Sequence, residues 1–160
     1  MGFFRNLFGS KKLLNNQALH PSGDVFGGFF SDLTTNQKCA ILAFESSVAS
    51  FAQGTINERE AIRMVTNEMN ALNISEGQFG SYAQVNAPRR VEDYVSGLRT
   101  IKDKAILDYV LYNSFGIAKM GGSEKALGYH LHVFKQLGYT EDEILNVIKK
   151  INSLGQQFGL

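Results

Sequence analysis

Three histidines and one cysteine carry the most versatile chemistry of this 160-residue chain, because imidazole and thiolate groups bind zinc and act in nucleophilic catalysis. His130 and His132 stand two residues apart in a segment with helical periodicity. On a helix this spacing places the two rings about 200° apart, so the pair does not fit one zinc ion. His130 shares an apolar stripe with Leu127 and Phe134. We expect it to be a core histidine with one hydrogen bond, and His132 to face outward.

The single cysteine, Cys39, has only Lys38 as a neighbouring cation. A reactive thiol needs a lowered pKa and a nearby base, and the sequence around Cys39 shows neither. We therefore expect Cys39 to pack as a small hydrophobic residue on a helix. One cysteine also excludes an internal disulfide and suits a reducing compartment. No apolar run reaches the roughly 20 residues of a membrane span, so a cytoplasmic protein is expected.

The segment 53–58, Gln-Gly-Thr-Ile-Asn-Glu, joins two expected helices and invites a test for calcium binding. An EF-hand loop needs oxygen ligands at alternate positions, a glycine at position six and a bidentate glutamate at position twelve. No Asp-x-Asp series precedes Gly54. The spacing does not fit an EF-hand.

Five carboxylates form two small acidic clusters, but each stands in the first turn of an expected helix: Glu58, Glu60, Glu141, Asp142 and Glu143. Negative charge at that position is stabilised by the helix dipole. This structural role accounts for all five, so we assign none of them to acid–base catalysis and expect no enzyme activity.

Charge is balanced over the whole chain, with 16 basic and 15 acidic residues and a formal net charge of +1. A phosphate-binding protein normally shows a broad basic stripe. Arg89 and Arg90 form only a small basic spot, so we expect no nucleic-acid partner.

The elements that position these residues are helices, since no stretch shows sustained alternation of apolar and polar residues. One arrangement occurs twice, over residues 36–76 and 102–143. In each copy an apolar helix ends at glycine (Gly54 or Gly121), and a second helix begins after a polar residue (Asn57 or Ser123). The sequence predicts an all-α fold with a single helical domain, residues 31–160, built from two helical-hairpin repeats.

Capping patterns and apolar stripes give the expected helix boundaries. Asn57 with Glu60 and Thr140 with Glu143 have capping-box spacing, while Thr34 or Thr35 can cap the first helix of the domain. Pro88 is expected to end the helix that Ser75 opens and to suit the first turn of the next helix. The expected buried stripe of the helix 58–72 is Ala61, Ile62, Val65, Met69 and Leu72.

Residues 1–30 are predicted to be a separate unit, with an amphipathic segment at residues 3–19 and a Gly-rich linker that contains His20. The segment combines an apolar stripe with three cations and no carboxylate: Phe3, Phe4, Leu7 and Phe8, with Arg5, Lys11 and Lys12. Such a composition suits an anionic membrane surface. Gly9 and Ser10 interrupt the stripe, however, so packing on the domain or on a twin in a homodimer stays open.

The doubled arrangement resembles the tellurite-resistance protein B-like (TerB-like) family. In that family a helix ends in Ala-Asp-Gly, a glutamate follows on the next helix, and a Leu-Gly-hydrophobic-Ser closing comes after it. Ala52-Gln53-Gly54 stands at the first motif and Glu60 at the glutamate position. Leu72-Asn73-Ile74-Ser75 and Leu137-Gly138-Tyr139-Thr140 match the closings. The resemblance covers about residues 36–150 and implies an all-helical fold.

The departures from the family pattern bear on metal binding, because the resemblance implies a divalent-metal site at its Asp and Glu positions. Gln53 and Met120 replace the two aspartates, and Leu127 replaces the second glutamate. The weak metal candidates that remain are Glu60, Glu58 and Asn57. We therefore expect a non-enzymatic interaction or scaffold module without a cofactor, with the stress-related role that the resemblance implies. The alternative is a regulatory domain that binds a divalent metal or small ligand at this degenerate acidic site.

Overall fold

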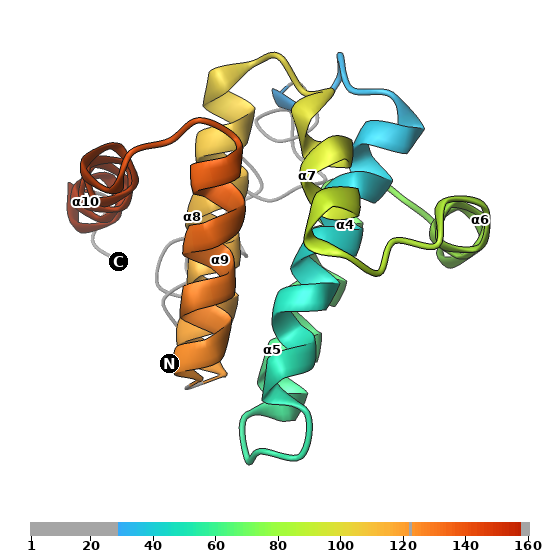
Figure 1. The fold of residues 1–160 in the computed structure, drawn as a ribbon, viewed down its shortest axis with the longest axis horizontal. Helices are drawn as coiled ribbons and strands as arrows, with labels where there is room; N and C mark the ends of the chain where they lie inside the picture. The colour runs from blue at the N-terminus through green and yellow to red at the C-terminus, as the bar shows by residue number, and fades with distance from the viewer. Residues whose placement is uncertain (1–28, 122, 158–160) are drawn as a thin grey trace.

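The computed structural model describes residues 29–121 and 123–157 (Figure 1). This part of the chain is one all-α domain of seven α-helices, with no strand, as the sequence predicts. The elements are α4 (Thr35–Ala49), the 3-10 turn η1 (Ser50–Ala52), α5 (Glu58–Ala71), α6 (Glu76–Asn86), α7 (Val91–Arg99), α8 (Lys104–Met120), α9 (Glu124–Gln136) and α10 (Glu141–Gln157).

Helix α4 is the centre of the domain, because α5, α6, α7, α8 and α9 all pack against it. Its residues from Cys39 to Glu45 are all buried, so the helix has no exposed face over this stretch. A helix that is apolar all round is typical of a core position. Figure 1 shows α6 and α10 on opposite sides of the molecule, with α8 and α9 side by side between α10 and the α4–α5 pair.

Most of the predicted caps are confirmed. Thr34 and Gln37 form a reciprocal capping box at the start of α4. Thr140 and Glu143 do the same before α10. The Ser123 side chain accepts a hydrogen bond from the backbone at the start of α9. These bonds link residues three apart, which is why the sequence alone reveals them.

The predicted capping box between Asn57 and Glu60 is wrong. Asn57 precedes α5 but its side chain forms no capping bond. The turn is closed instead by the Gly54 N–H, which donates to Glu58 Oε2 at 3.1 Å, and by the Asn57 N–H, which donates to Thr55 Oγ1 at 3.2 Å. The side chains of the turn itself compete with the cap for the same backbone groups.

The prediction that a helix ends before Pro88 is confirmed, but the prediction that Pro88 lies in the first turn of the next helix is wrong. Helix α6 ends at Asn86, Ala87 takes a left-handed conformation with φ 40°, and α7 begins only at Val91. Arg90 is the residue before α7, because Asp93 accepts hydrogen bonds from the backbone N–H groups of Arg89 and Arg90 and so sets the helix start. Pro88 therefore lies in the connection and not in a first turn.

The predicted buried stripe of α5 is wrong at Ile62, whose side chain is 55% exposed. The helix buries Ala61, Met64, Glu68 and Ala71 instead. Glu68 thus occupies a core position, whereas the apolar pattern predicted that its neighbour Met69 would do so. Met69 is only half-buried.

The second helix pair follows the sequence more closely. Helix α8 buries Ile106, Val110, Leu111 and Ala118, and α10 buries Ile144, Val147 and Ile148, all at helical spacing in the sequence. Phe29 and Phe30 also contact the core, with their rings against the Tyr109 ring.

Candidate functional site

The deepest polar group in the domain is a cluster of four side chains from three helices. Glu45 comes from α4, Glu68 from α5, and Tyr109 and Asn113 from α8. Both glutamates and Asn113 are 0% exposed. We call these four residues the carboxyl cluster. It lies where α4, α5 and α8 pack together in the core.

Hydrogen bonds within the carboxyl cluster converge on one of the two glutamates. Tyr109 Oη donates to Glu68 Oε1 at 2.9 Å, and Asn113 Nδ2 donates to Glu68 Oε2. Both oxygens of Glu45 lack a donor, and so does Asn113 Oδ1. An unpaired buried polar atom is costly, since it loses its bonds to water without replacement.

The electrostatics of the cluster follow from burial and from the closeness of the two carboxyl groups. Burial raises the pKa of Glu45 well above its usual range, and the charge of Glu68 raises it further. Burial also raises the pKa of Glu68, while hydrogen bonds from Glu45, Tyr109 and Asn113 act in the opposite direction. The two glutamates titrate as a pair and not as independent groups.

The bond between the two glutamates exists only in one protonation state. Two ionised carboxylates are both acceptors and form no hydrogen bond with each other. The two carboxyl groups nevertheless lie close enough for each to shift the pKa of the other. A bond forms when one of the pair keeps a proton, and the chemistry that the arrangement supports first is therefore proton binding.

The carboxyl cluster was not predicted from the sequence, although a signal was present. Glu45 directly follows the apolar run Ala40–Phe44, which has no polar face to hold it. Glu68 lies seven residues after Ala61 and four after Met64, on their face of α5. A charged residue inside an apolar stripe is a sign of a buried, paired group.

A second region of interest lies at the connection between α4 and α5, which projects at the lower end of the molecule in Figure 1. Ile56 is 99% exposed, Ile62 55% and Phe51 37%. An open pocket of about 250 Å³ is lined by Ser46, Ala49, Ser50, Gln53, Glu58, Ile62, Val65 and Thr66. Of the three exposed residues, Ile62 belongs to this lining, while the Phe51 ring lies 5.4 Å from the ring of Tyr129. We call the lining residues together with Phe51 and Ile56 the hairpin-tip surface.

The three metal candidates from the sequence border this surface. Glu58 already accepts the Gly54 N–H, and Glu60 pairs with Arg63 at 3.7 Å. The Asn57 side chain forms no capping bond. Within the described ranges, no three residues of the types His, Cys, Asp and Glu are grouped so that they could hold a metal ion. The structure does not bring the three candidates together as a metal centre.

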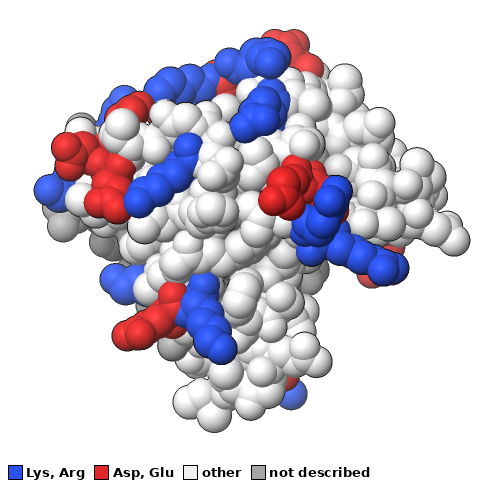
Figure 2. Space-filling model, viewed as in Figure 1, with Lys and Arg blue, Asp and Glu red and all other residues white. Residues whose placement is uncertain are grey.

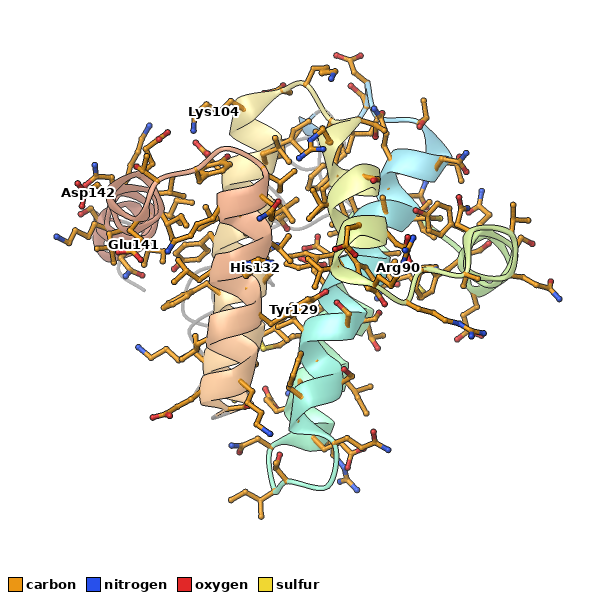
Figure 3. All side chains as sticks on the ribbon, viewed as in Figure 1. Arg90, Lys104, Tyr129, His132, Glu141 and Asp142 are labelled. Carbon is orange, nitrogen blue, oxygen red and sulfur yellow. The ribbon has the colours of Figure 1, made fainter. Side chains whose placement is uncertain are left out.

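His130 lies in the core as predicted, and its Nε2 is 2.9 Å from the Leu111 carbonyl oxygen. His132 is exposed on the outward side of α9 (Figure 3). Cys39 is fully buried, and this burial raises the pKa of its thiol. A raised pKa keeps the thiol protonated and unreactive.

Several polar side chains near the surface have structural partners. Lys104 pairs with Asp108 at 3.0 Å and lies over the ring of Tyr139, which itself donates to Asp108. Tyr129 of α9 bonds Ser47 of α4 at 2.7 Å. These contacts join α8 to the connection between α9 and α10, and α9 to α4.

Charged side chains on the face drawn in Figure 2 form small mixed groups, with no broad patch of one sign. At one basic spot the backbone N–H groups of Arg89 and Arg90 lower the pKa of Asp93 to about 2.

The seven N-terminal contact residues that the sequence predicts lie outside the described residues, as does His20. The seven are Phe3, Phe4, Arg5, Leu7, Phe8, Lys11 and Lys12.

Comparisons of the chain with family models, with curated proteins and with solved structures found no match. Among the described residues, no helix combines the length and the hydropathy that a membrane span requires. The function must therefore be argued from the geometry of the domain itself.

Proposed function

We propose that this domain is a non-enzymatic protein-interaction module and that the hairpin-tip surface is its docking site. The observation that carries the proposal is the exposure of three large apolar side chains, Phe51, Ile56 and Ile62, at one end of the molecule. Single exposed apolar residues are common, but a group beside a pocket is typical of an interaction site.

The arrangement of α5 supports this proposal. The core contact of α5 runs through Ala61, Met64 and Glu68, which leaves Ile62 and the half-buried Val65 to line the pocket. The lining contains one carboxylate, Glu58, and no lysine or arginine. The surface therefore favours an apolar segment that carries positive charge.

The N-terminal segment, residues 3–19, has this composition, with three phenylalanines, three cations and no carboxylate. It lies outside the described residues, and we propose it as the occupant. Residues 20–28 span up to about 30 Å when extended, whereas α4 is about 22 Å long. Since Phe29 lies just before α4 and the pocket near its C-terminal end, the linker can reach the pocket in the same chain or in a second copy.

A single tryptophan can test this docking, because the chain contains none. In a Phe8→Trp variant of the full chain, we expect blue-shifted tryptophan emission, and Ile62→Asp added to it should shift the emission to the red. Val85→Asp is the matched control, since Val85 is 83% exposed on α6, away from the pocket lining. Emission that depends on dilution indicates a second copy, and emission that does not indicates the same chain.

Two results would contradict the proposal. Emission that is unchanged by Ile62→Asp would exclude the hairpin-tip surface as the docking site. Emission that shifts to the blue only after anionic vesicles are added would favour the membrane-peripheral alternative for residues 3–19.

The division of the domain into two repeats is also proposed. We infer that α4–α5 and α8–α9 are two helical-hairpin repeats of a TerB-like fold, and the support is the shared order of helix, glycine turn, capped helix and closing in the sequence. The stress-related role comes from this resemblance alone. The alternative of a divalent-metal regulator at Glu58, Glu60 and Asn57 has less support, because Glu58 and Glu60 already have protein partners.

A further inference from the structure

The donors around the carboxyl cluster are distributed unequally between its two acids. Glu68 accepts hydrogen bonds from Tyr109 on one oxygen and from Asn113 on the other. Glu45 accepts none on either oxygen. Two donors stabilise a negative charge, whereas a buried carboxylate without any donor is strongly disfavoured. Glu68 is therefore suited to be the ionised member and Glu45 the neutral one.

We propose that Glu45 and Glu68 form a proton-binding site in which Glu45 keeps its proton at neutral pH and donates it to the Glu68 carboxylate. The proton joins α4 to α5, and the Tyr109 and Asn113 bonds join the same carboxylate to α8. Protonation of one buried group thus holds three helices together.

Among the residues that the structure describes, no positive group pairs with either glutamate in place of this proton. Glu45 is on α4, Glu68 on α5, and α8 contributes the neutral Tyr109 and Asn113. The segment before α4 presents the Phe29 and Phe30 rings to Tyr109. The ionisable residue among the buried residues of α9 is His130, whose ring nitrogen bonds the Leu111 carbonyl. Within residues 29–121 and 123–157, no lysine, arginine or histidine forms an ion pair with either glutamate.

The site makes the packing of α5 sensitive to pH. Burial raises the pKa of Glu45, so the folded domain holds a proton that the unfolded chain releases. The stability from this proton is complete below the unfolded pKa of about 4.5 and declines as pH rises toward the folded pKa. Loss of the proton would place two negative charges together in the core and would loosen α5. This inference does not depend on what binds the hairpin-tip surface.

The test compares full-length wild type with Glu45→Gln, Glu68→Gln and the exposed control Glu92→Gln, by urea unfolding from pH 5 to 9. Glutamine at position 45 keeps a donor toward Glu68 but does not titrate. We therefore expect the unfolding equilibrium constant of wild type to rise relative to Glu45→Gln by up to about tenfold per pH unit. Glu68→Gln should raise the unfolding equilibrium constant at least about tenfold at pH 6, because glutamine is a weaker acceptor for the Tyr109 and Asn113 donors. Glu92→Gln should follow wild type.

Infrared spectroscopy gives a second readout that does not require equal stability. At pH 7.5 the carbonyl band of a protonated carboxyl group is expected in wild type and in Glu92→Gln, and its loss is expected in Glu45→Gln. Absence of the band in wild type would overturn the proposal. So would a stability ratio between wild type and Glu45→Gln that does not change with pH.

A divalent ion is the competing occupant of the cluster. We expect Mg²⁺, Ca²⁺ or Mn²⁺ alone to leave the melting temperature of wild type unchanged. A rise in melting temperature in wild type that is absent in Glu45→Gln would overturn the proton site in favour of a cation site.

Discussion

The two helix pairs of this domain both bury an ionisable group, but they stabilise it in different ways. The α4–α5 pair buries Glu45 and Glu68, which depend on each other and on two side chains from α8. The α8–α9 pair buries His130, which bonds a backbone carbonyl of α8 and packs among the rings of Phe44, Phe115 and Phe134. A lone histidine becomes neutral at little cost, whereas a carboxyl pair needs a proton and matched donors.

The pairs therefore respond to pH with opposite signs. Burial lowers the pKa of His130 to about 4, so the unfolded chain binds a proton there that the folded domain does not. Stability from His130 is present above the unfolded pKa of about 6.5 and declines as the pH falls toward 4. Burial raises the pKa of Glu45, so its contribution declines as the pH rises. Stability is expected to be greatest at mildly acidic to neutral pH.

The largest expected effect comes from Glu68→Leu, which removes the acceptor of two buried donors and the partner of Glu45. Breaking such a buried polar network costs about 3–5 kcal/mol in the free energy of unfolding. Chemical unfolding at pH 6 measures the change. A loss below about 1 kcal/mol would mean that the cluster does not hold the first helix pair to α8.

The next effect concerns acid stability and is tested with His130→Gln, which keeps a donor for the Leu111 carbonyl but does not titrate near neutrality. Between pH 6.5 and 4, wild type is expected to lose roughly 3 kcal/mol more than this variant, since each pKa unit corresponds to about 1.4 kcal/mol. Thermal or urea unfolding across this range gives the comparison. Parallel pH profiles for the two proteins would contradict the neutral, buried state of His130.

The smallest effect is expected at Glu60→Gln, on the same helix as Glu68. Because Glu60 forms a surface ion pair with Arg63 and no capping box with Asn57, the change in stability should stay within about 0.5 kcal/mol. The melting temperature with and without Ca²⁺ should also match that of wild type. A metal-dependent rise in wild type that this variant lacks would revive the acidic metal site.

Much of the fold was predictable because the evidence for it is local. The caps at Thr34, Ser123 and Thr140 depend on bonds to residues three positions on, and the apolar stripes of α8 and α10 follow helical spacing. The core place of His130 also follows from its position on an apolar stripe. The wrong predictions at Asn57 and Pro88 also have local causes. Thr55 accepts the backbone N–H of Asn57, and Asp93 accepts that of Arg89, so α7 starts later than expected.

The carboxyl cluster could not be predicted in the same way. The two donors to Glu68 are far from it along the chain: Tyr109 is 41 positions away and Asn113 is 45 positions away. The sequence shows a glutamate in an apolar run, but not which helix provides its donors. The same holds for Ile62, whose exposure depends on which face of α5 meets α4 and α8.

By itself the sequence determined the helical class, most helix boundaries and the buried histidine, since each rests on contacts within one helix or one turn. Only the tertiary structure decided that Glu68 enters the core while Ile62 stays at the surface. The physical reason is that burying a carboxyl group is favourable only where other helices supply its donors and a proton, and those partners meet only when the chain is folded.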